Sequence, residues 1–134
     1  MTEAKASGPF TILLAEDEPA ARMLMATVLR TDGYVVLDAP DAAAAETLAG
    51  KYGVPPALLV TDYVMPGMNG AQLADRLRGR FPGLKVLLVS AHIDEEPVQK
   101  AIMEEAFKKG AAFLQKPFTP EELSRKVRAV LQGL

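Results

Sequence analysis

The strongest constraint on the fold of this chain is a regular alternation of short apolar runs with longer amphipathic segments. Five apolar runs recur along the sequence, at residues 11–15, 34–38, 57–61, 85–90 and 111–115. Their length is that of β-strands, and their near-continuous apolar character is typical of strands covered on both faces of a sheet. We therefore interpret them as the strands of a buried sheet.

The segments between these runs have helical periodicity. In residues 19–32, the apolar residues Ala21, Leu24, Met25 and Val28 share one stripe of a helix. The same reasoning predicts helices over residues 42–49, from the 65–70 loop to residue 80, from about residue 94 to residue 109, and over residues 120–131. Strands that alternate with helices predict an α/β fold, with a doubly wound parallel sheet and helices on both faces.

Composition excludes several classes of protein. The chain has 134 residues, no cysteine, one histidine and a net charge of −2. Disulfides, thiol catalysis and zinc sites built from cysteine are excluded, and one histidine cannot form a histidine metal site. Direct nucleic-acid binding is not expected without a basic block. No apolar run approaches the roughly 20 residues that span a bilayer, and no signal peptide is evident, so we expect a cytoplasmic protein.

Chemically useful side chains follow the carboxyl ends of four predicted strands. They are Glu16 and Asp17, Asp62, Ser90 and Lys116. In an open parallel sheet these ends meet at one edge, where ligands bind. Crowded carboxylates repel one another unless a cation neutralises them, and oxygen ligands favour a hard ion such as magnesium or calcium. Magnesium fits better, because it uses one or two carboxylates and shares phosphate oxygens.

This set of residues is suited to phosphoryl transfer. An aspartate such as Asp62 can attack phosphorus as a nucleophile, while Lys116, the hydroxyl of Ser90 and a metal balance the charge on the phosphoryl oxygens. Simpler roles remain open for single residues. Asp17 could cap the helix that follows, Asp62 could cap a turn, and Lys116 could be a surface lysine paired with a carboxylate.

The motifs resemble the receiver domain of bacterial response regulators. The segments that carry the resemblance are ILLAEDEPAAR, LLVTDYVMPGMNG, VLLVSAH and FLQKPFTPEEL. Their order and spacing cover nearly the whole chain, and the last one is similar to receivers of hybrid histidine kinases. The resemblance implies a flavodoxin-like strand order 2-1-3-4-5. It also implies a phosphoprotein of two-component or phosphorelay signalling, which a histidine kinase or histidine phosphotransfer protein phosphorylates.

Matching positions imply a role for each site residue. By the resemblance, Asp62 would be the phosphoacceptor and Lys116 would contact the phosphoryl group. The magnesium ligands would be Glu16, Asp17, Asp62 and the backbone carbonyl of Val64. Ser90 and Phe113 would be the switch residues, and the peptide bond between Lys116 and Pro117 would be cis. Such a domain catalyses its own phosphorylation and dephosphorylation without being a conventional enzyme. Residues 1–9 are expected to be a flexible lead-in, and residues 10–134 to be the receiver domain.

Three features depart from the family pattern or refine it. Phe113 stands where a tyrosine is common, and the stretch from Ser90 to Lys116 is longer than usual by about four residues, roughly one helical turn. This predicts a longer fourth helix or a longer loop before it. Val64 and His92 occupy positions that tune dephosphorylation. Because valine cannot orient a water molecule, we expect a long-lived phosphoryl group.

Three rival functions fit the sequence less well. An aspartate-nucleophile phosphatase usually has a second aspartate two residues after the first, where this chain has Val64. A flavin-binding protein would need a loop rich in glycine and hydroxyl groups after the first strand, which is acidic here. A receiver-like binding module that works without phosphorylation is the main alternative. The sequence leaves open the cognate kinase, the downstream target, the oligomeric state and the choice between a stand-alone regulator and a domain of a hybrid kinase.

Overall fold

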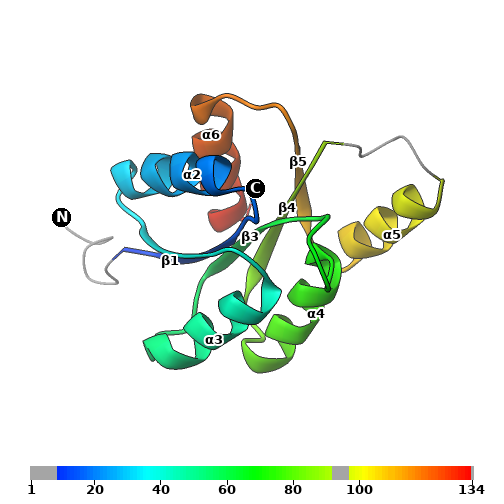
Figure 1. Cartoon of the computed structure of the whole chain (residues 1–134), viewed down its shortest axis with the longest axis horizontal. Helices are drawn as coiled ribbons and strands as arrows, with labels where there is room; N and C mark the ends of the chain where they lie inside the picture. The colour runs from blue at the N-terminus through cyan, green and yellow to red at the C-terminus, as the bar shows by residue number, and fades with distance from the viewer. Residues whose placement is uncertain (1–8, 92–96, 134) are drawn as a thin grey trace.

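The structure of the chain is a computed structural model that describes residues 9–91 and 97–133 (Figure 1). Five strands and five helices alternate along it. In chain order they are β1 Thr11–Ala15, α2 Pro19–Thr31, β2 Val35–Ala39, α3 Ala42–Tyr52, β3 Leu58–Asp62, α4 Gly70–Arg80, β4 Lys85–Ser90, α5 Pro97–Lys108, β5 Ala112–Gln115 and α6 Pro120–Leu131. The α/β alternation predicted from the sequence is confirmed.

The strands form one parallel sheet in the order β2-β1-β3-β4-β5. Helices α2 and α6 cover one face, and α3, α4 and α5 lie on the other (Figure 1). Each face has its own apolar core, one centred on residues such as Ile12 and Leu29, the other on residues such as Leu13 and Leu73. Successive residues of β1 point to opposite faces, both of which are covered, and this is why the strand is apolar from Ile12 to Ala15. The predicted doubly wound sheet and its strand order are confirmed.

Side-chain caps begin several helices. The carboxylate of Asp41 accepts a hydrogen bond from the Ala44 amide at 2.8 Å at the start of α3, and Thr119 and Glu122 form a capping box at the start of α6. Glu18, not Asp17, caps α2, because its Oε1 atom accepts a hydrogen bond from the Ala21 amide at 2.7 Å. The carboxylate of Asp17 is therefore not used as the cap of this helix.

Some boundaries differ from the prediction. Helix α3 continues through Gly50 to Tyr52 and ends at Gly53, whose φ of 85° is in the left-handed region. A Cβ atom on Gly50 would lie 2.7 Å from an Arg80 guanidinium nitrogen, so this glycine allows close packing of α3 and α4 rather than breaking the helix. The second strand is displaced by one residue, and β3 extends to include Asp62.

Two predictions fall on residues that are not described. The predicted start of the helix at about residue 94, and His92, lie outside the described residues. The extension between Ser90 and Lys116 therefore remains a prediction. None of the helices in the described ranges combines enough length and hydrophobicity to cross a membrane.

Candidate functional site

The predicted site residues gather at the carboxyl edge of the sheet. Asp62 ends β3 and Ser90 ends β4, while Glu16 and Lys116 directly follow β1 and β5. They line a cavity of about 190 Å³, together with Asp17, Glu18, Val64, Val89 and Ala91. Because β1, β3, β4 and β5 are consecutive in the sheet, residues that are 100 positions apart come into contact here.

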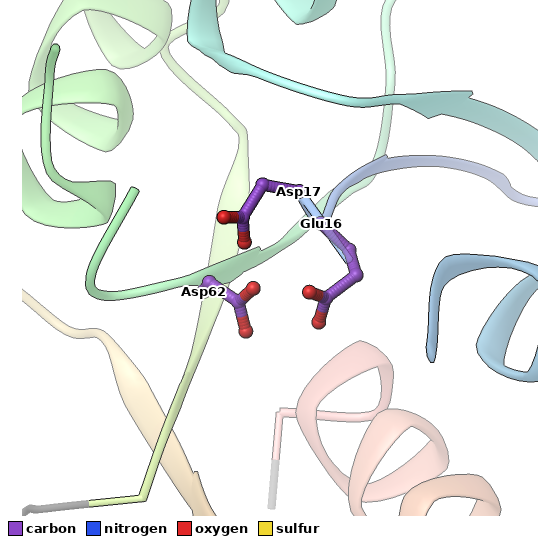
Figure 2. Close-up of side chains that lie close together, drawn as sticks. All are labelled: Glu16, Asp17 and Asp62. Carbon is purple, nitrogen blue, oxygen red and sulfur yellow. The ribbon is translucent and has the colours of Figure 1, made fainter. Parts of the chain in front are cut away.

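Three carboxylates face one another in this cavity. Figure 2 shows the side chains of Glu16, Asp17 and Asp62 directed into the same space from the ends of two neighbouring strands. One oxygen from each lies within 4.8 Å of the others. Glu16 is 1% exposed and Asp62 is 6% exposed, whereas Asp17 is exposed to solvent. Closely spaced carboxylate oxygens without nitrogen or sulfur ligands suit a hard divalent cation such as magnesium.

Lys116 is the cation that already contacts this cluster. Its Nζ atom lies 3.0 Å from Asp62 Oδ1 and 3.1 Å from Glu16 Oε1. The other carboxylate oxygen of Glu16 accepts a hydrogen bond from the Glu18 amide at 3.0 Å. One ammonium group does not balance three carboxylates. The remaining negative charge favours either a proton or a metal ion in the cavity.

The pKa values show where that proton resides. Burial is the main cause that raises the pKa of Asp62, to about 8, and its hydrogen bond with Glu16 adds to the effect, while Lys116 opposes it. Burial also pushes the pKa of Glu16 upward, but contacts with Asp62, the Glu18 amide and Lys116 outweigh burial and lower the pKa. Without a bound cation, the raised pKa of Asp62 and the lowered pKa of Glu16 therefore favour a proton shared by the two carboxylates.

The pKa of Lys116 is raised. Burial lowers it, but the contacts with Asp62 and Glu16 prevail. The lysine is therefore an ammonium ion throughout the physiological range. It can stabilise negative charge that develops on a group bound to Asp62.

Ser90, Val64 and Phe113 take different places around the cavity. Ser90 is buried at its wall, and the Ser90 carbonyl accepts a hydrogen bond from the Lys116 amide at 2.9 Å. Val64 lies at the rim and is 66% exposed. Phe113 does not line the cavity; this half-buried side chain stacks on Phe107, with ring centroids 6.4 Å apart. The peptide bond between Lys116 and Pro117 is cis.

Three residues that support the site were not singled out in the sequence. Thr61 Oγ1 donates a hydrogen bond to the Asp62 carbonyl at 3.0 Å, and the Gly70 amide donates one to the Tyr63 carbonyl at 2.7 Å. A Cβ atom on Gly70 would lie 2.3 Å from the Asp62 carbonyl oxygen, so only glycine fits. Arg22 contacts the backbone carbonyl of Glu16. The glycine after a capping asparagine was visible in the sequence, but its contact with Asp62 depends on tertiary structure.

Comparisons with known proteins agree with this geometry. Residues 12–128 match the family model of the response regulator receiver domain. The chain is 32% identical over 126 residues to the sensor kinase CckA of Brucella abortus. It is 41% identical over 125 residues to the probable transcriptional regulatory protein NarL of Mycobacterium tuberculosis. Among solved structures, the receiver domain of the hybrid histidine kinase CckA superposes with a TM-score of 0.74 at 32% identity, covering 91% of this chain and 99% of that domain.

These relatives are longer than the matched region. The match covers 94% of this chain but 13% of the sensor kinase, and 91% of this chain but 55% of the transcriptional regulator. The similarity is therefore to one domain, shared by proteins whose other parts differ.

Proposed function

The chain belongs to the response regulator receiver domain family, and on this premise we propose that Asp62 accepts a phosphoryl group from a phosphohistidine and thereby switches the conformation of the domain. The observation that carries the proposal is the grouping of three carboxylate oxygens within 4.8 Å of one another, with Lys116 bonded to two of the carboxylates. A nucleophile, a cation site and a fixed positive charge are the parts that phosphoryl transfer requires.

In the proposed reaction, an oxygen of the ionised Asp62 carboxylate attacks phosphorus. An O–P bond forms as the N–P bond of the phosphohistidine breaks, and the departing imidazole nitrogen keeps the electron pair and takes up a proton. Lys116 exchanges its contact with Asp62 Oδ1, now 3.0 Å long, for one with a phosphoryl oxygen. The Ser90 hydroxyl donates to another phosphoryl oxygen. Such contacts stabilise the product without covalent chemistry of their own.

Magnesium is the cofactor of the proposed site. Glu16, Asp17 and Asp62 would hold it through carboxylate oxygens, one of the first two through water, and the carbonyl of Val64 would complete the protein ligands. A bound ion would supply positive charge next to the phosphoryl oxygens. Burial favours a proton on Asp62, and this proton would be lost on cation binding, so the nucleophile would then be ionised.

The proposed switch connects the cavity to the outer edge of the sheet. Ser90 and Phe113 lie on the neighbouring strands β4 and β5, where Ser90 pairs with Gln115 and Phe113 pairs with Leu88. Movement of Ser90 toward the phosphoryl group would open space for the Phe113 ring to turn inward. A contact made in one conformer alone shifts the population toward it. The surface of α5, β5 and α6 would then present the signal to a target.

The partner that supplies the phosphoryl group is a histidine kinase or a histidine phosphotransfer protein, in the cytoplasm. Exposed apolar side chains on α2 and at the cavity offer a docking surface: Met23 and Leu24 on α2 are 71% and 57% exposed, and Val64, which lines the cavity, is 66% exposed. Exposed apolar groups around a polar site are typical of protein-binding surfaces. The domain would act as a phosphorelay component, alone or as part of a hybrid kinase, and not as a conventional enzyme.

The phosphoryl group of this domain is expected to persist for minutes or longer. Val64 is exposed at the cavity rim and has no group that could hold a water molecule in line with phosphorus. Catalysis of its own dephosphorylation would therefore be slow. Decay of purified phosphoprotein within seconds at neutral pH would contradict this part of the proposal.

Phosphoryl transfer from a protein donor tests the proposed function. A histidine phosphotransfer protein labelled with radioactive phosphate is mixed with the wild-type chain and with Asp62→Asn. We expect magnesium-dependent movement of the label to the wild-type chain, located on Asp62 by peptide mapping, and none to the variant. If several such donors and small-molecule phosphodonors all fail, the domain works as a binding module without phosphorylation.

A further inference from the structure

Arg22 links the acidic end of β1 to the end of β2. Its Nη1 atom donates a hydrogen bond to the backbone carbonyl of Glu16 at 2.9 Å, and its Nε atom lies 3.6 Å from Asp38 Oδ2. The Arg22 side chain is 21% exposed, so it is largely packed rather than free in solvent. Asp38 lies on β2, next to the residue whose carbonyl accepts a hydrogen bond from the Glu16 amide at 3.0 Å.

The carbonyl that Arg22 contacts belongs to the peptide unit between two of the three acidic residues. Its orientation affects the directions in which the Glu16 and Asp17 side chains leave the backbone. The Glu16 carboxylate is held by Lys116 and by the Glu18 amide. The exposed side chain of Asp17 is not packed in this way, so its direction depends on the peptide unit before it.

Asp38 keeps Arg22 in place and balances its charge. Arg30 also pairs with Asp38, at 3.0 Å from the Oδ1 atom, and donates to the Val36 carbonyl at 2.8 Å. The two arginines therefore share one carboxylate. Only Arg22 also reaches Glu16, so the pair provides an internal comparison between a residue that touches the acidic segment and one that does not.

From these contacts we propose that Arg22 is a positioning residue for the cation site. Its guanidinium group fixes the peptide unit between Glu16 and Asp17, so that the Asp17 carboxylate is directed toward those of Glu16 and Asp62 before an ion binds. This rests on the proposed function, because it assigns Arg22 a role at the magnesium site of that function. Groups that orient metal ligands in this way commonly contribute a factor of about 10 to 100 in metal affinity.

The positive charge of Arg22 and its hydrogen bond to Glu16 are expected to have opposite effects on magnesium affinity. Removal of a positive charge near the carboxylates would strengthen cation binding, whereas loss of the hydrogen bond to Glu16 would weaken it. Arg22→Lys separates the two effects, because lysine keeps the charge but lacks the planar group that bonds to the Glu16 carbonyl and to Asp38 together. If geometry dominates, both Arg22→Ala and Arg22→Lys bind magnesium more weakly than the wild type.

The test is calorimetric titration of magnesium chloride into the wild-type chain, Arg22→Ala, Arg22→Lys and Arg30→Ala. Urea unfolding establishes that each variant is folded, and amide NMR spectra report the environment of the Asp17 amide. We expect dissociation constants about ten-fold higher in both Arg22 variants. In Arg30→Ala, which loses only an exposed ion pair and a contact to β2, we expect a change of less than about two-fold.

The other possible results of the titration would overturn the role of Arg22, or the proposed function with it. Equal magnesium affinity in the wild type and both Arg22 variants would overturn the role of Arg22 and leave the proposed function intact. Equal weakening in Arg30→Ala would also overturn it, because the effect would then pass through Asp38 or overall stability. Absence of magnesium binding by the wild-type chain would overturn the proposed function and the role of Arg22 with it. If Arg22→Ala does not fold, Arg22→Lys carries the comparison.

Discussion

At the scale of single residues, Asp62 combines burial with two carboxylate neighbours. Its pKa is raised to about 8, far above its ordinary value of 3.8. A carboxyl group with a raised pKa in the folded state stabilises the fold while it is protonated. That stabilisation is complete below the unfolded pKa and is lost as the pH rises through the folded pKa. Metal-free protein should therefore lose stability between pH 4 and pH 8, from this group, by up to about 1.4 kcal/mol per pH unit.

Asp62→Asn isolates this contribution because it removes the titrating group. In metal-free buffer, we expect the free energy of unfolding of the wild type to fall relative to that of the variant as the pH rises from 5 to 8. Excess magnesium should diminish the difference, because the ion replaces the proton. Urea unfolding of both proteins between pH 5 and pH 8 measures this difference in the free energy of unfolding. Parallel pH profiles for the two proteins would show that Asp62 is not protonated in the native state.

Lys116 is the second residue whose removal has a defined expected effect. Lys116→Gln leaves Glu16 and Asp62 without their shared ammonium, and we expect a loss of about 1–3 kcal/mol in metal-free stability, partly restored by magnesium. Lys109→Gln is the matched control, since Lys109 pairs with Asp75 at 3.3 Å on the surface. We expect Lys109→Gln to lower the free energy of unfolding by less than about 1 kcal/mol, and magnesium to change this loss little. Equal responses in the two variants would contradict the assigned role of Lys116.

At the scale of elements, the start of α4 is fitted against the end of β3. Gly70→Ala would place a methyl group 2.3 Å from the Asp62 carbonyl oxygen, so we expect a destabilisation of about 1–3 kcal/mol and slower phosphorylation. Gly79→Ala in the same helix meets nothing within 4 Å and should stabilise the fold by about 0.5–1 kcal/mol. Thermal unfolding and acetyl phosphate kinetics compare them. Unchanged stability and phosphorylation rate in Gly70→Ala would mean that a small shift of the loop before α4 relieves the close contact with the Asp62 carbonyl.

Helix α5 and strand β5 meet through two aromatic rings. Phe107 is 67% exposed and stacks on the half-buried Phe113, with ring centroids 6.4 Å apart. A stacked pair contributes about 0.5–1.5 kcal/mol, so in the proposed switch Phe107→Ala should favour the inward position of Phe113 and speed phosphorylation by acetyl phosphate several-fold. NMR signals of isotope-labelled Phe113 report the position. Unchanged signals and rate would exclude a role for this pair.

The helices and strands were easier to predict from the sequence than their terminal residues and their side-chain contacts. Continuous apolar runs identify β1, β3 and β4 because both faces of each strand are covered. Helix α3 continues past its predicted end to Tyr52, and the Arg80 guanidinium group, far away in the sequence, lies where a Cβ atom on Gly50 would stand. The grouping of Glu16, Asp62 and Lys116 followed from the rule that strand ends meet at one edge. The contribution of Arg22 depends on a side-chain contact that no periodicity reports.

At the scale of the whole molecule, two apolar cores hold the sheet between its helices and leave the carboxyl edge for chemistry. Helices α2 and α6 pack on one face, and α3, α4 and α5 lie on the other (Figure 1). Among the described residues at this edge, Lys116 neutralises only part of the negative charge of the three carboxylates. A ligand that binds only the folded state stabilises it, so magnesium and a phosphoryl group should each raise the stability of the entire domain.

Magnesium-dependent phosphorylation of Asp62 is best tested by the mass of the intact protein after incubation with acetyl phosphate. Samples with and without magnesium are compared with Asp62→Asn, and Asp75→Asn serves as a control for a surface aspartate. We predict one added phosphoryl group in the wild type and in Asp75→Asn, present only with magnesium, and none in Asp62→Asn. An adduct that persists in Asp62→Asn, or no adduct in the wild type under any condition, would contradict the account.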